Sequence, residues 1–216
     1  MAKVNTNEEL LENAELQTKS FFTKHSKTII GTFIAVLVIG MGIALWQLLW
    51  VKPFEKEAQV ALFKAQAAFE SQTADYAALL VEFENVAKNY ESTPAGNQAL
   101  FYAASCALRG GDLEKASQHI NSFEEVDGDM GATINALALC LKGDIAVEKK
   151  QYAEAAKLFE QAAEHKNSYS APLALFKAAL TYNALGNEAQ AQAALKKIVE
   201  YYGASYQAIE AQKMLK

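Results

Sequence analysis

The chain has 216 residues, of which 51% are hydrophobic and 21% charged, and its formal net charge at pH 7 is -5. Ala, Leu, Glu, Lys and Gln dominate while only three prolines occur, which favours helices, so we predict an all-α protein. With a single arginine, Arg109, and no basic stripe interleaved with aromatic residues, the charge pattern of a nucleic-acid binder is missing. Nucleic acid is therefore excluded as a partner.

Residues 1–27 form a polar N-terminal tail that ends in the run KSFFTKHSK. Apolar residues between positions 10 and 18 follow helical spacing, which favours a short helix. A frayed, unstructured tail is the other interpretation, and both remain open.

Residues 28–51 carry no charged side chain over 24 positions. As a helix that rises about 1.5 Å per residue, this stretch reaches about 36 Å, enough to cross a hydrocarbon core of about 30 Å. A cleaved signal peptide would have a shorter apolar region and a small-residue cleavage site, whereas this stretch ends with the bulky Trp46 and Trp50. We predict a single transmembrane helix over 28–51.

The orientation of this helix is only weakly indicated by charge. Three lysines lie close to each end of the stretch: Lys19, Lys24 and Lys27 before it, and Lys52, Lys56 and Lys64 after it. Because the counts are balanced, the rule that basic residues favour the cytoplasmic side does not determine the orientation of the helix. A span this close to the N-terminus is typical of proteins with a cytoplasmic tail, which predicts that 1–27 is cytoplasmic and 52–216 lies outside.

Two pairs of small residues lie one helical turn apart within the stretch, Gly31 with Ala35 and Gly40 with Ala44. Such pairs let a second membrane helix approach closely. They are also common on faces that contact only lipid, so lateral docking to a membrane partner and a lipid-facing role both remain open.

The part after the apolar stretch, 52–216, contains a repeat. Four segments align at 74–88, 111–125, 150–164 and 186–200, with Tyr76, Leu113, Tyr152 and Glu188 as equivalent residues spaced by 37, 39 and 36 positions. Each segment has apolar or small residues three, seven and ten positions further on, which is one face of a helix. Nine positions before each equivalent residue lies a small residue: Ala67, Ala104, Gly143 and Ala179.

A small residue at that place predicts a close crossing of two helices, and the turns between them are marked by Gly110, Gly111 and Asp112 and by Gly186 and Asn187. The pattern resembles the tetratricopeptide repeat. Its third unit matches best, with Gly143, Tyr152, Ala155, Phe159 and Ala162. The resemblance implies a solenoid of about four helical hairpins.

In such a solenoid the first helices of the hairpins line a concave groove. The repeat register assigns eight residues to a partner-binding groove: Phe101, Ser105, Arg109, Asp144, Glu148, Phe176, Leu180 and Asn183. The exposed aromatic residues would supply apolar anchors. Alternatively, Phe101 and Phe176 belong to the core between the helices.

The order of tail, single span with tryptophans at its far end, and divergent repeats is similar to the YfgM-type ancillary subunit of the bacterial Sec translocon. That resemblance implies a single-pass protein of the bacterial inner membrane with a cytoplasmic N-terminus and a periplasmic repeat domain. It also implies that its partners are translocon subunits, a periplasmic chaperone or emerging chains.

Signatures of catalysis and of metal binding are missing from the sequence. His25, His119 and His165 lie far apart, and there is neither an HExxH nor a CxxC motif. We expect His119 and His165 on solvated helix faces and the acidic run 124–129 in a solvated loop. Cys106 and Cys140 are expected as buried thiols, with a disulfide as the alternative.

These observations predict no enzyme, no cofactor, no metal and no small-molecule substrate. The predicted function is a membrane-anchored protein-interaction module at the Sec translocon. The alternative is a structural or assembly adaptor of the cell envelope.

Overall fold

The computed structural model describes residues 4–71 and 73–215 of the chain. Within these ranges the backbone forms ten α-helices and one short π-helix and no β-strand, which confirms the predicted all-α class. The contacts divide the chain into two units, Met1–Phe54 and Glu55–Lys216.

The first unit contains the long helix α1, Val4–Trp46, which includes most of the tail and of the apolar stretch. The tail is therefore helical from Val4, while residues 1–3 lie outside the described part. A π-helix, Gln47–Val51, follows directly. Among the described residues one helix is long and apolar enough to cross a membrane, and none of its apolar window is buried in the structure.

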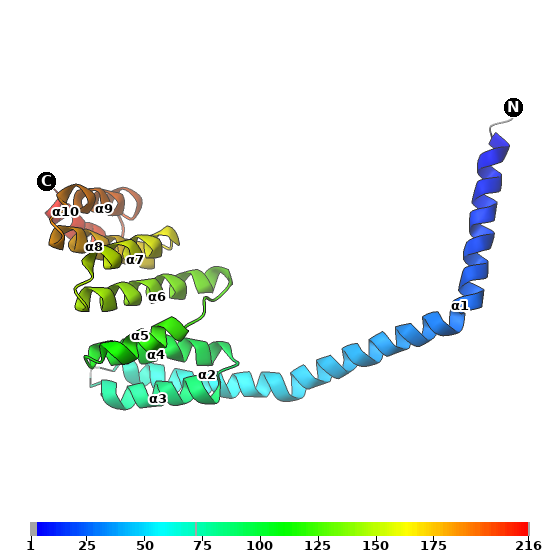
Figure 1. Cartoon of the computed structure of the whole chain (residues 1–216), viewed down its shortest axis with the longest axis horizontal. Helices are drawn as coiled ribbons and strands as arrows, with labels where there is room; N and C mark the ends of the chain where they lie inside the picture. The colour runs from blue at the N-terminus through cyan, green and yellow to red at the C-terminus, as the bar shows by residue number, and fades with distance from the viewer. Residues whose placement is uncertain (1–3, 72, 216) are drawn as a thin grey trace. The chain divides into compact units, whose positions relative to one another are not determined.

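The repeat unit consists of four helical hairpins and a last helix (Figure 1). The hairpins pair α2 (Lys52–Phe69) with α3 (Tyr76–Asn89), α4 (Pro94–Arg109) with α5 (Leu113–Ser122), α6 (Gly128–Glu148) with α7 (Tyr152–Glu164), and α8 (Ser170–Ala184) with α9 (Glu188–Tyr201). The last helix, α10 (Tyr206–Met214), packs beside α8 and α9. The predicted number of about four hairpins is confirmed.

The second helix of every hairpin begins at the residue that the repeat register marks as equivalent: Tyr76, Leu113, Tyr152 and Glu188. Three of these helices are capped by a polar side chain directly before them. Asp75 accepts from the backbone N–H of Ala77 and Ala78, and Asp112 and Asn187 each accept from the backbone N–H three residues on. These caps satisfy backbone donors that the first turn leaves free.

The turns inside the second, third and fourth hairpins share one backbone geometry. In each, two N–H groups after the first helix bond back to its last carbonyls, for example Gly111 to Leu108 and Asp112 to Ala107. The residue at the centre has a left-handed φ: 80° at Gly111, 71° at Gly186 and 60° at Lys150. Lysine is strained there because its Cβ crowds the backbone in this region.

Replacing Lys150 with glycine is therefore expected to raise the free energy of unfolding by about 1 kcal/mol. Chemical denaturation followed by circular dichroism measures the change. Glu148→Gly, two residues earlier at the exposed end of α6, serves as the control and should lower stability by about 0.5–1 kcal/mol. A destabilised Lys150→Gly variant would show that the left-handed geometry is not a strain on the hairpin.

The predicted close crossings are present in three of the four hairpins. Ala104 and Ala179 are fully buried, and a Cβ added to Gly143 would lie 2.5 Å from Cε1 of Phe159. In the first hairpin the prediction is wrong, since Ala67 is exposed and Ala65 is buried instead. The connection between α2 and α3, 70–75, is three residues longer than the connection 110–112 of the second hairpin. The residue of α2 that crosses α3 therefore lies earlier in the sequence than an offset of nine residues predicts.

The core is divided into four clusters along the repeat unit. The first joins α2, α3 and α4, the next joins α4, α5 and α6, a third is built mainly by α6, α7 and α8, and the last joins α8, α9 and α10. Cys106 and Cys140 lie in different clusters as free thiols. Burial raises the pKa of Cys106 to about 11 and that of Cys140 to about 12, so both thiols stay protonated.

The linker between α5 and α6 is held by two asparagine side chains. Asn97 on α4 bonds to both the N–H and the C=O of Glu124, each at 2.8 Å. Asn135 on α6 bonds in the same way to Val126, each at 2.9 Å. The acidic side chains of Glu124, Glu125 and Asp127 are exposed as expected, and that of Asp129 lies outside the described part.

Candidate functional site

Two grooves lie at equivalent places between second helices of successive hairpins. One, of about 460 Å³, is lined by residues of α3, α4 and α5. The other, of about 720 Å³, is lined by residues of α7, α8 and α9. Glu84 and Glu160 occupy the same place in the two grooves, eight residues after Tyr76 and Tyr152 respectively. We call them the α3/α5 groove and the α7/α9 groove.

In the α3/α5 groove the glutamate is fully paired. Oε1 of Glu84 lies 2.9 Å from Nε2 of His119 and 3.2 Å from Nζ of Lys115, both on α5. The His119 side chain is only 15% exposed, so the expected solvated position is wrong. The face of α5 that carries His119 is turned toward α3. Because the residues next to His119 in the sequence are polar, the sequence pattern indicated a solvent-exposed face instead.

These contacts change the titration of Glu84. Burial alone would raise the pKa of the Glu84 carboxyl, but the hydrogen bonds and charges of His119 and Lys115 outweigh it and lower the pKa below its ordinary value. A carboxyl whose pKa is lowered by folding adds stability above its unfolded pKa of about 4.3, and this is lost as the pH falls through the folded value.

Wild-type protein should therefore lose more unfolding free energy between about pH 5 and pH 3 than the Glu84→Gln variant. Urea denaturation at a series of pH values measures both curves. Glu82→Gln, on the exposed face of the same helix, is the control and should follow the wild type. Parallel curves for wild type and Glu84→Gln would contradict the assignment.

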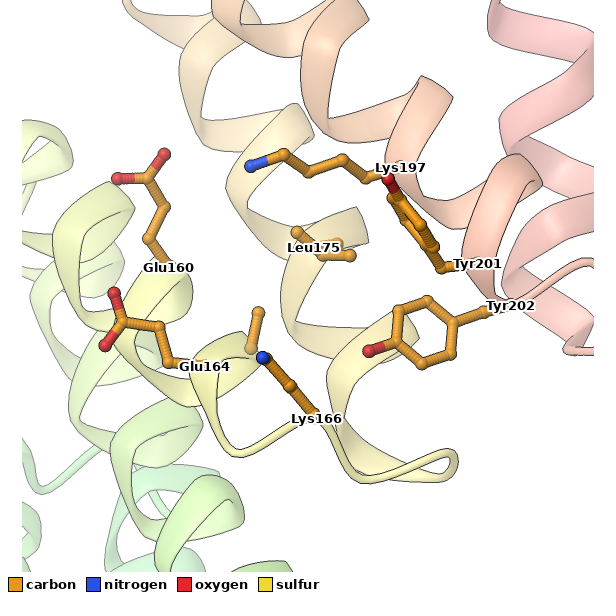
Figure 2. Close-up of a pocket in the computed structure, with 8 residues that line it drawn as sticks. Glu160, Glu164, Lys166, Leu175, Lys197, Tyr201 and Tyr202 are labelled. Atoms are coloured by element: carbon orange, nitrogen blue, oxygen red, sulfur yellow. The ribbon is translucent and has the colours of Figure 1, made fainter.

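The α7/α9 groove has walls of different charge, as Figure 2 shows. Glu160 and Glu164 project from α7 on one side, and Lys197, Tyr201 and Tyr202 come from α9 on the other. Leu175 of α8 lies between them and is 7% exposed, whereas Tyr201 is 68% exposed. Burial and a hydrogen bond to Glu160 raise the pKa of the Tyr182 hydroxyl to about 12.

The two phenylalanines of the predicted first-helix groove are half-buried. Phe101 packs edge-on against Tyr102 and Phe123. Phe176 packs against the cluster of α8, α9 and α10. Both positions fit the alternative interpretation, in which these rings belong to the core.

Two charged residues of the predicted groove are engaged within the fold. Arg109 donates to the hydroxyl of Tyr76 at 2.9 Å, and its guanidinium lies 5.3 Å from the Phe69 ring centre and 5.0 Å from that of Tyr76. Asp144 is paired with Lys177 of α8 at 2.6 Å.

Ser105 is half-buried, and the remaining residues of the predicted groove are exposed: Glu148, Leu180 and Asn183. None of the eight predicted residues lines either groove between the second helices.

The small residues of the apolar stretch lie on an open surface. A Cβ added to Gly31 or Gly40 would meet no atom within 4 Å, and Ala35 and Ala44 are exposed. The two pairs lie on opposite sides of α1, nine residues or about 180° apart, and no other part of the described protein covers either side.

Over the described ranges no group of three or more His, Cys, Asp or Glu side chains is placed to hold a metal ion. The two grooves and the exposed first-helix residues are the candidate binding surfaces.

The model of the tetratricopeptide repeat-like domain family matches residues 19–213. The chain belongs to this family. The match begins before the apolar stretch and ends in α10, so it covers most of α1 as well as the four tetratricopeptide-like hairpins. Solenoids of this type present extended binding surfaces, and the domain is a protein-interaction module by family and fold.

Among solved structures, the crystal structure of MamA is 17% identical, with a TM-score of 0.47, and the match covers 64% of this chain and 81% of the MamA chain. No curated protein matches the chain.

Proposed function

We propose that this protein is a membrane-anchored adaptor whose tetratricopeptide-like domain binds another protein. The observation that carries the proposal is the apolar window of the N-terminal helix, none of which is buried by the described protein. A core helix of a soluble domain would bury that window, whereas a membrane span leaves it to lipid. The proposed parts are a cytoplasmic tail 1–27, a transmembrane helix 28–51 and a repeat domain 52–216.

The finer proposal places the adaptor in the bacterial inner membrane at the Sec translocon, with the repeat domain in the periplasm. The order of tail, span and repeats supports it, through the resemblance to the YfgM-type subunit. Its partners would be translocon subunits, a periplasmic chaperone or emerging chains. The second candidate, a structural or assembly adaptor of the cell envelope, is supported by the same architecture and by two open small-residue pairs on α1, Gly31 with Ala35 and Gly40 with Ala44.

Protease treatment of intact spheroplasts tests the orientation. External protease should digest the repeat domain while an epitope on the N-terminal tail stays protected. Protection of the repeat domain, with digestion only after lysis, would place it in the cytoplasm and refute the periplasmic proposal.

Crosslinking from the span tests the location. A photoreactive residue at Ala44 in native membranes should capture translocon subunits, with Val38 as an exposed control position about 120° around the same helix. Capture of this chain alone, or of wall-assembly proteins, would favour the structural adaptor.

The first-helix face is one proposed binding surface, and it is best tested at residues without a role in the fold. Leu180→Asp and Asn183→Asp alter exposed positions of α8, whereas Arg109→Glu or Phe176→Ala would disturb packing contacts. Loss of a copurified partner, with an unchanged melting curve, is the expected result. Unchanged copurification in both variants would remove this face from the proposal.

A further inference from the structure

The two equivalent grooves differ in how their shared glutamate is paired. In the α3/α5 groove, Lys115 and His119 both contact Glu84. The equivalent positions on α9 are Gln190 and Ala194, which cannot supply a cation. Within the described residues Glu160 forms no ion pair, and its contact is the uncharged hydroxyl of Tyr182.

The other charges of the α7/α9 groove are also without an ion pair among the described residues: Glu164, Lys166 and Lys197. The carboxylates lie along the α7 wall, while Lys197 extends from the opposite wall above Leu175 (Figure 2). The groove is therefore neutral in sum, with both carboxylates on the α7 side, Lys197 on the α9 side and Lys166 on the loop directly after α7. The rings of Tyr201 and Tyr202 offer apolar surface beside the largely buried Leu175 at the base of the groove.

We propose that the α7/α9 groove is a docking site for a segment of a protein partner that carries an apolar side chain flanked by a cation and a carboxylate. The apolar side chain covers Leu175, the cation meets Glu160 and Glu164, and the carboxylate meets Lys197. Charge complementarity selects this occupant, because a segment with one sign of charge would oppose one wall. The cation takes the place that Lys115 and His119 fill in the α3/α5 groove.

This inference rests on the proposed function, since it assumes a protein partner, but it names a different surface from the first-helix face. The groove between second helices lies where neither Leu180 nor Asn183 is found. A partner could use either surface, so the two are separable by experiment.

Synthetic peptides test the charge pattern directly. Three fluorescent helical peptides of roughly 14 residues, about four turns, share a leucine stripe and differ in its borders: Lys on one side and Glu on the other, Lys on both, or Glu on both. Anisotropy titration against the full-length protein in nanodiscs, corrected with empty nanodiscs, gives their affinities. The mixed peptide should bind about fivefold or more tighter than the other two, because only it pairs with both walls.

Two variants should change this preference. Lys197→Glu makes both walls acidic and should favour the peptide with Lys on both sides. Glu160→Gln combined with Glu164→Lys removes the acidic wall while leaving an acceptor for Tyr182, and should favour the peptide with Glu on both sides. Matched controls are Lys196→Glu and Glu82→Lys, exposed residues outside the groove, which should keep the wild-type order. Equal affinities for all three peptides, or an order that neither variant changes, would overturn the proposal.

Photocrosslinking separates failure of this site from failure of the adaptor function. A photoreactive residue at Tyr201 reports on the α7/α9 groove, and one at Asn183 reports on the first-helix face. If a partner crosslinks at Tyr201 and the peptide order holds, the proposal stands. A partner that crosslinks at Asn183 alone keeps the adaptor function and refutes the groove, whereas no partner at either position counts against both.

Discussion

Gly143→Val is expected to lower the free energy of unfolding by about 3 kcal/mol. The Cβ of any larger residue at position 143 would lie 2.5 Å from Cε1 of Phe159, closer than two carbons can approach. Phe159 is itself 1% exposed and packed among buried alanines, so its ring has no space into which to move. The strain would separate α6 from α7 and weaken the third hairpin.

Urea denaturation of the full-length protein in detergent measures this effect. Adding Phe159→Ala should make the double variant more stable than the sum of the two single effects predicts, because the smaller side chain makes room for valine. Strict additivity would show that the close approach of Gly143 and Phe159 is not the cause. Ala179→Gly, at the equivalent place in the fourth hairpin, is the control and should cost about 1 kcal/mol.

Asn135→Ala is expected to destabilise the repeat unit by about 2–3 kcal/mol. Its side chain is 8% exposed, and its amide satisfies both the N–H and the C=O of Val126. Alanine would leave these part-buried groups without partners, and unpaired buried polar groups cost more than a hydrogen bond adds.

Asn97→Ala is the matched comparison, because Asn97 makes the same pair of bonds to Glu124 in an exposed setting. Water can replace it there, so a loss of under about 1 kcal/mol is expected. Thermal and urea unfolding of both variants measure the difference. Equal losses of unfolding free energy in the two variants would show that burial does not determine how much these hydrogen bonds contribute to stability.

Repeat register predicted the hairpins well because apolar spacing and turn residues recur in every unit. All four second helices begin at the equivalent residues Tyr76, Leu113, Tyr152 and Glu188. The exception is Ala67, which is exposed although the repeat register places it at a close helix crossing. A longer connection before α3 shifts α2 along the sequence, and a fixed offset of nine residues cannot detect a change in loop length.

Side-chain contacts between the helices of the repeat unit were less predictable, because they join residues that the repeat spacing does not relate. The pair of Glu84 and His119 links α3 to α5, and the bonds of Asn97 link α4 to the linker after α5. Arg109 was expected to be available in a groove, yet its guanidinium lies over Phe69 and Tyr76. A sequence shows that such side chains are polar, whereas only the packing of neighbouring hairpins shows which partner each one meets.

The division of the core has a consequence for how the repeat unit opens. Its four clusters are each shared by neighbouring hairpins, and none extends from the first hairpin to the last. Cooperativity is then one-dimensional, since each hairpin is stabilised only by those on either side of it. The final helix α10 has neighbours on one side alone, so breathing motions begin there and travel inward hairpin by hairpin, while the middle of the array exchanges its amide protons last.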